Sequence, residues 1–153
     1  MITGIAQILL VEDNRADANL VQEALAEAHL ECLLSVVREG EQAIQFIDRL
    51  DADPTRPRPD IVLLDLNLPR VGGEEVLKRV RLSPACAAVM VLIVSSSDAK
   101  ADRERAMALG ASDYFCKPAD LEQFMELGPK IRAMLESGAV GPPVSPTGGG
   151  FAG

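Results

Sequence analysis

Short apolar runs alternate along the chain with segments whose apolar residues recur every three or four positions. A short apolar run is typical of a buried strand, and the longer spacing is typical of a helix with one buried face. The runs predict strands at residues 8–11, 33–37, 61–64, 89–94 and 114–116. Strands that alternate with helices in this way predict an α/β fold.

Each predicted strand is followed by a helical segment, and three of these segments have recognisable end signals. Asn14 is placed to cap the first helix, and Gly110 is placed to end the fourth, near Leu109. Asp120 opens the fifth helix with Gln123 three residues on, which is the spacing of a capping box. The second and third helices are predicted from the apolar stripes at 43–50 and 76–80.

Several strands are apolar throughout, which is typical of parallel strands covered by helices on both faces. We therefore expect a doubly wound α/β domain with a five-stranded parallel sheet and five helices. The folded domain is expected to span residues 1–136. Residues 137–153 are rich in glycine and proline and lack periodicity, so a disordered tail is expected there.

Composition narrows the class of protein. Of the 153 residues, 48% are hydrophobic, which suits one ordinary core in a single domain. No apolar run approaches the roughly 20 residues of a membrane helix, and the N-terminus has no signal-peptide pattern, so we expect a cytoplasmic protein without a membrane partner. The formal net charge of −8 argues against a nucleic-acid partner, because such proteins present basic patches.

Polar residues gather where the predicted strands end. In an open parallel sheet, ligands bind beyond the carboxyl ends of the strands. The residues at or just past those ends are Glu12 and Asp13, Asp65 with Asn67, Ser95, and Lys117. We expect these side chains to lie together at one edge of the sheet.

This set suits phosphoryl transfer. Three carboxylates, Glu12, Asp13 and Asp65, would repel one another unless a cation joined them, and oxygen ligands favour Mg²⁺. Lys117 is expected to pair with Asp65 or a phosphate, and the Ser95 hydroxyl to donate a hydrogen bond to one. Asp65 would be the nucleophile and form an acyl phosphate.

The segment after Asp65 fits the same interpretation. Gly72 and Gly73 allow a tight bend and leave room beside the site, and Pro69 stiffens the turn. Taken one at a time, each site residue could instead be an ordinary cap, turn or solvated residue. Their coincidence at four strand ends favours a functional site.

These residues lie in four stretches that together resemble the receiver domain of two-component response regulators. The stretches are "ILLVEDN", "DIVLLDLNLPRVGGEEVL", "VLIVSSSDA" and "GASDYFCKPADLEQF", and the resemblance spans residues 7–136. It implies a flavodoxin-like sheet with strand order 2-1-3-4-5. It also implies a signalling switch with weak self-phosphorylation and autodephosphorylation rather than an enzyme.

The resemblance assigns roles position by position. Asp65 matches the phosphoacceptor, and Lys117 matches the family's lysine, joined to Pro118 by a cis peptide bond. Ser95 matches the switch hydroxyl, and Tyr114 the aromatic that swings inward on activation. The Mg²⁺ ligands would be Glu12, Asp13, Asp65 and the backbone carbonyl of Asn67.

The sequences of two stretches, "VEDNRADANLVQEAL" and "KPADLEQF", are most similar to those of stand-alone response regulators of bacterial phytochromes and other sensor histidine kinases. The expected partners are such a kinase and a downstream protein or phosphotransfer partner. We expect no output domain after Glu136, which fits a single-domain regulator.

Two positions depart from the family pattern. Glu12 is one methylene longer than aspartate, which would alter Mg²⁺ affinity. Gly128 and Pro129 fall inside the last helix, where proline costs about 3 kcal/mol or more, so we predict a kink or restart near Gly128. The family's common dimer face includes this helix, so a homodimer would use other contacts.

Two rival functions remain open. A phosphatase of the haloacid-dehalogenase type also uses a strand-end aspartate with Mg²⁺, but it needs a second aspartate two residues later, where Asn67 stands and cannot carry a proton. An interaction module that never becomes phosphorylated would keep the same fold. The complete set of acids, Ser95 and Lys117 argues against that second rival.

Overall fold

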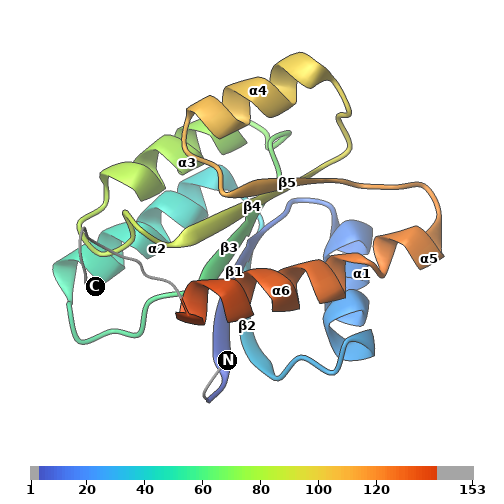
Figure 1. Ribbon diagram of the computed structural model, residues 1–153. Coiled ribbons are helices and arrows are strands. Elements are labelled where there is room, and N and C mark those ends of the chain that lie inside the picture. Colours follow the sequence, from blue (N-terminus) through green and yellow to red (C-terminus); the bar gives the residue numbers. More distant parts are fainter. Residues whose placement is uncertain (1–3, 141–153) are drawn as a thin grey trace.

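Five parallel strands form the central sheet of the computed structural model, which describes residues 4–140. The strands are β1 (Ala6–Val11), β2 (Cys32–Val37), β3 (Ile61–Leu64), β4 (Met90–Ser95) and β5 (Asp113–Cys116). They lie in the order β2-β1-β3-β4-β5, and every neighbouring pair is parallel (Figure 1). The predicted doubly wound fold and strand order are confirmed.

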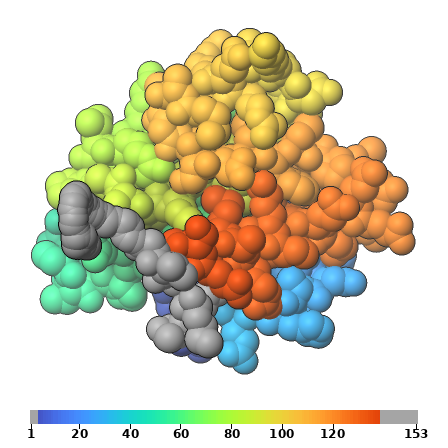
Figure 2. Space-filling model, viewed as in Figure 1, coloured from blue at the N-terminus to red at the C-terminus, as the bar shows by residue number. Residues whose placement is uncertain are grey.

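Helices cover both faces of the sheet. They are α1 (Arg15–Glu27), α2 (Gly40–Ala52), α3 (Gly73–Leu82), α4 (Lys100–Ala108), α5 (Leu121–Phe124) and α6 (Leu127–Val140). Helices α2, α3 and α4 pack on one face around Val62, Leu64 and Ile93, and α1, α5 and α6 pack on the other around Ile8, Leu10 and Leu63. Figure 2 shows α6 (red) spanning the middle of the second face.

The end signals read from the sequence are mostly present. The Asn14 side chain accepts a hydrogen bond from the Asp17 amide at 2.9 Å, and Gly110 has a φ of +109° just past α4. Asp120 caps α5, but its carboxylate accepts from the Glu122 amide rather than forming the predicted capping box with Gln123.

The segment predicted as the last helix forms two helices, in agreement with the predicted restart near Gly128. Helix α5 ends at Phe124, and α6 begins at Leu127. Pro129 is therefore in the first turn of α6, where its missing N–H removes no intrahelical hydrogen bond. Helix α6 continues to Val140, beyond the expected domain end at Glu136, and residues 141–153 of the predicted tail lie outside the described residues.

Gly128 has a packing role that the sequence does not reveal. A Cβ atom at this position would overlap the Ala24 carbonyl oxygen and lie 2.8 Å from the Ala28 Cβ, both in or next to α1. Only glycine lets the start of α6 approach α1 this closely. Among residues 4–140, no helix is long and apolar enough to cross a membrane.

We predict opposite effects for two glycine-to-alanine changes in α6. Gly128→Ala should lower the free energy of unfolding by about 1–3 kcal/mol, because the added methyl group overpacks the contact with α1. Gly138→Ala should raise it by up to about 1 kcal/mol, because alanine favours helix and the new Cβ would meet only the flexible end of Met90. Urea unfolding measures both, and a stabilising Gly128→Ala would contradict the close-packing account.

Candidate functional site

The register of the sheet brings three acidic residues to one edge. Val11 pairs with Leu64, so Glu12 and Asp65 follow the ends of two adjacent strands. One carboxylate oxygen each from Glu12, Asp13 and Asp65 lie within 4.8 Å of one another. Glu12 and Asp65 are only 1% and 5% exposed, whereas Asp13 is more accessible to solvent. The predicted acidic cluster is therefore present.

Lys117 reaches this cluster from the end of β5. Its Nζ atom donates hydrogen bonds to Glu12 Oε1 at 2.8 Å, Asp17 Oδ2 at 2.8 Å and Asp65 Oδ2 at 3.3 Å. The Lys117 side chain is 8% exposed, and its backbone amide donates to the Ser95 carbonyl at 2.7 Å. The predicted pairing of Lys117 with Asp65 exists, but two further carboxylates share the same ammonium.

Asp17 is the site residue that the sequence analysis missed. It lies in the first turn of α1, three residues after the cap Asn14. A carboxylate in the first turn of a helix that starts just beyond a strand end lies above the same sheet edge. That position was the signal available in the sequence.

The phosphoacceptor candidate Asp65 is held by hydrogen bonds that involve both its backbone and its side chain. Its amide donates to the Val11 carbonyl at 3.1 Å, and its Oδ1 accepts from the Asn67 amide at 3.0 Å. Helix α3 begins directly against the Asp65 backbone, where a Cβ on Gly73 would overlap the Asp65 carbonyl oxygen. Gly72, also predicted to provide room, has a φ of −75° and open space around it, so that residue is not required to be glycine.

Ser95 and Tyr114 are linked through Ser97. The buried Ser95 Oγ accepts from the Ser97 amide at 3.2 Å, and the Tyr114 hydroxyl donates to the Ser97 carbonyl at 2.8 Å. The Ser97 hydroxyl donates to Asp102 of α4 at 2.5 Å. Tyr114 is already inside the protein, with the Arg103 guanidinium 5.2 Å from its ring centre. The strand end is thereby connected to α4.

The cis peptide bond that the family resemblance implied for Lys117–Pro118 is not present, and that expectation is wrong. Residues 4–140 contain no cis peptide bond, so this bond is trans. The trans form is intrinsically favoured before proline by about 0.5–1 kcal/mol, and here Lys117 reaches all three carboxylates from a trans backbone.

Burial and charge set the protonation of the cluster. Burial raises the pKa of the Glu12 carboxyl to about 7; the hydrogen bond from Lys117 opposes this shift and the charge of Asp65 adds to it. Burial by itself would lower the pKa of Lys117, but its hydrogen bonds to Asp17 and Glu12 and the charge of Asp65 raise it above the ordinary value. Lys117 therefore stays positively charged.

The cluster fits a hard divalent cation. All three converging side chains offer carboxylate oxygens, which suit Mg²⁺ or Mn²⁺. Asp13 opens the cluster to solvent, so a bound ion could keep water ligands.

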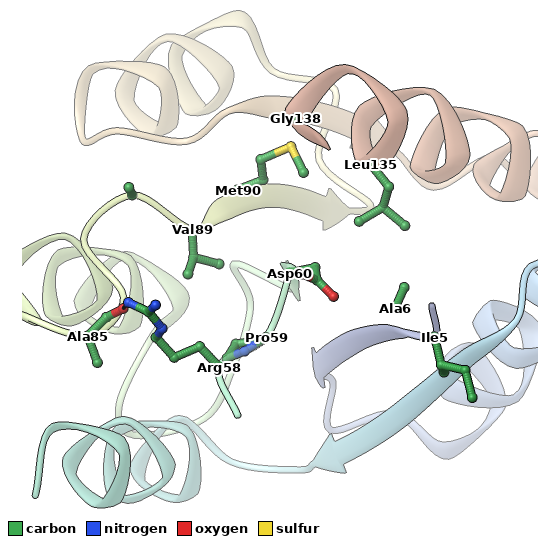
Figure 3. Close-up of a pocket in the computed structure, with 11 residues that line it drawn as sticks. Ile5, Ala6, Arg58, Pro59, Asp60, Ala85, Val89, Met90, Leu135 and Gly138 are labelled. Carbon is green, nitrogen blue, oxygen red and sulfur yellow. Dashed lines mark hydrogen bonds between the residues drawn. The ribbon is translucent and has the colours of Figure 1, made fainter. Parts of the chain in front are cut away.

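A separate cavity of about 640 Å³ lies at the other end of the strands (Figure 3). Ala6 and Met90, the first residues of β1 and β4, line it together with Asp60, which directly precedes β3, and Leu135 of α6. Parallel strands place this edge away from the acidic cluster. The cavity is therefore not part of the candidate site.

Comparison with known proteins gives one family. The family model described as the response regulator receiver domain matches residues 8–127, which include all the predicted site residues. Response regulator Rcp1 of Synechocystis sp. is 33% identical over 120 residues, which cover 78% of this chain and 82% of Rcp1. The family predicted from the sequence motifs is confirmed.

Solved structures agree with this family. The phosphorylated cyanobacterial phytochrome response regulator RcpA has a TM-score of 0.78 and 34% identity, over 88% of this chain and 96% of RcpA. The Mn²⁺-bound form of Rcp1 has a TM-score of 0.75 and 32% identity, over 86% of this chain and 96% of Rcp1. The bacteriophytochrome response regulator RtBRR has a TM-score of 0.68 and 35% identity, over 80% of this chain and 75% of RtBRR.

The raised pKa of Glu12 predicts a pH-dependent stability. Between its ordinary pKa of 4.5 and its raised pKa of about 7, Glu12 is mostly protonated in the folded protein and mostly ionised in the unfolded chain. This contribution to the free energy of unfolding is fully present below about pH 4.5 and is lost as the pH rises through about 7. Without divalent ions, the free energy of unfolding of wild type should therefore fall between about pH 5 and about pH 7 relative to that of Glu12→Gln. Urea unfolding at a series of pH values measures this difference.

Glu27→Gln is the matched control, because Glu27 is an exposed glutamate at the end of α1. It should keep the pH profile of wild type. Parallel profiles for wild type and Glu12→Gln would contradict the raised pKa of Glu12.

Proposed function

The chain belongs to the response regulator receiver family, and we propose that its Asp65 accepts a phosphoryl group from a phosphohistidine donor. The observation that carries this proposal is the environment of Asp65. Its carboxylate lies at the carboxyl edge of the sheet, beside the Lys117 ammonium and within 4.8 Å of the Glu12 and Asp13 carboxylates.

The transfer is a simple displacement at phosphorus. An Asp65 carboxylate oxygen forms a bond to phosphorus while the phosphorus–nitrogen bond of the donor histidine breaks, and the released imidazole keeps the bonding electrons and takes a proton. The product is an acyl phosphate on Asp65. In such chemistry the protein acts mainly by positioning groups and neutralising charge on the phosphoryl oxygens.

The neighbouring residues supply that positioning. The Asn67 amide orients the Asp65 carboxylate, and Lys117 offers positive charge next to it. Ser95 is at the end of the adjacent strand β4, where its hydroxyl can donate to a phosphoryl oxygen.

We propose Mg²⁺ as the resident metal. Glu12, Asp13 and Asp65 would hold it with their carboxylates, and Asn67 with its backbone carbonyl. The Mn²⁺-bound form of Rcp1 supports a divalent ion in this family. When bound, Mg²⁺ supplies positive charge to the phosphoryl oxygens.

The phosphorylated state acts as a switch, with weak self-phosphorylation and autodephosphorylation as its own chemistry. The added group brings about two negative charges to Asp65. Ser95, at the end of the neighbouring strand, is connected through Ser97 to Tyr114 and to α4, whose surface would present the change to a downstream protein or phosphotransfer partner.

The proposed donor is a cytoplasmic sensor histidine kinase of the phytochrome type. The relatives RcpA and RtBRR, named as phytochrome and bacteriophytochrome response regulators, support this choice. Should the chain form a homodimer, the break between α5 and α6 favours contacts other than the family's common face.

Acetyl phosphate tests the phosphoacceptor directly. Wild type incubated with this small donor and Mg²⁺ should gain one phosphoryl group by intact mass, because the donor needs only the residues of this site. Removal of Mg²⁺ with a chelator should abolish most of the gain. Asp65→Asn should gain none, because its amide cannot form an acyl phosphate.

Asp98→Asn is the matched control. Asp98 is an exposed aspartate in the loop after β4, at the same edge of the sheet. This variant should be phosphorylated like wild type. A phosphoryl adduct on Asp65→Asn, or none on wild type, would refute the assignment.

A further inference from the structure

Asp17 shares the Lys117 ammonium with Glu12 and Asp65. We propose that Asp17 is a positioning residue that holds Lys117 in its resting place and must release it when Asp65 carries a phosphoryl group. The inference rests on the proposed function, since it concerns the residue that Lys117 leaves in order to contact that group.

The ammonium of Lys117 has no spare hydrogen bond in the resting structure. An ammonium donates three hydrogen bonds, and those of Lys117 go to Glu12, Asp17 and Asp65. The contacts to Glu12 and Asp17 are 2.8 Å, whereas that to Asp65 is 3.3 Å. Lys117 therefore lies closer to Glu12 and Asp17 than to the phosphoacceptor. Its bond to Asp65 can pass to a phosphoryl oxygen, but any second contact with that group requires that Glu12 or Asp17 be released.

Asp17 is the carboxylate whose release costs least. Glu12 is 1% exposed, and its other oxygen accepts a hydrogen bond from the Asn14 amide at 3.1 Å. The Asp17 side chain is 29% exposed, so water can replace Lys117 there. A buried carboxylate left without its partner costs much more than one that water can reach.

The position of Asp17 also determines which way Lys117 moves when it leaves this carboxylate. Asp17 comes from the first turn of α1, whereas the other two carboxylates follow β1 and β3. Lys117 released from Asp17 moves toward the strand ends, where a phosphoryl group on Asp65 would lie. Asp17 thereby biases the site toward the unphosphorylated state.

Beryllofluoride, which mimics a phosphoryl group on aspartate, measures this bias at equilibrium. Calorimetric titration in saturating Mg²⁺ should give a dissociation constant about two- to fivefold lower for Asp17→Asn and Asp17→Ala than for wild type, the range expected for a partly exposed ion pair. Glu23→Gln, which removes an exposed carboxylate farther along α1, should bind like wild type.

A crystal structure of the wild-type beryllofluoride complex gives the second readout. Lys117 Nζ should contact a fluorine and no longer donate to Asp17. A retained Lys117–Asp17 bond in the complex, or equal affinity for Asp17→Asn and Glu23→Gln, would overturn the inference. Failure of wild type to bind beryllofluoride at all would instead contradict the proposed phosphoacceptor function.

Discussion

The site depends on the pairing of the buried Lys117 ammonium with three carboxylates. The ammonium joins carboxylates from three elements, because Glu12 follows β1, Asp17 is in α1 and Asp65 follows β3. Two of these carboxylates are almost wholly buried, and without a cation their mutual repulsion and desolvation would destabilise this edge of the sheet. The raised pKa of Glu12 indicates that one lysine does not fully offset that cost.

The sheet order makes this cluster possible. Strand β3 lies between β1 and β4, so Asp65 is at the centre of the edge and Ser95 lies one strand away from it. Lys117 directly follows the edge strand β5, and its ammonium contacts Glu12, which directly follows β1. An apolar layer on each face of the sheet holds these strand ends in place, and the residues just beyond them form the acidic cluster.

Much of this arrangement was predictable from the sequence, for a physical reason. Apolar runs mark the buried strands, and parallel strands bring their carboxyl ends together, so Glu12, Asp65 and Lys117 could be placed at one edge. The role of Asp17 was not predicted because it depends on how α1 is rotated against the sheet. The need for glycine at 128 likewise depends on the separation of α6 and α1, which no local pattern encodes.

The most direct measurement is the chemical location of the phosphoryl group. Borohydride reduces an acyl phosphate on aspartate to the alcohol of homoserine, and peptide mass spectrometry then identifies the residue. The account predicts homoserine at position 65 in protein treated with acetyl phosphate and Mg²⁺, and unmodified Glu12, Asp13 and Asp17. Homoserine at another aspartate, or none anywhere, would contradict Asp65 as the phosphoacceptor.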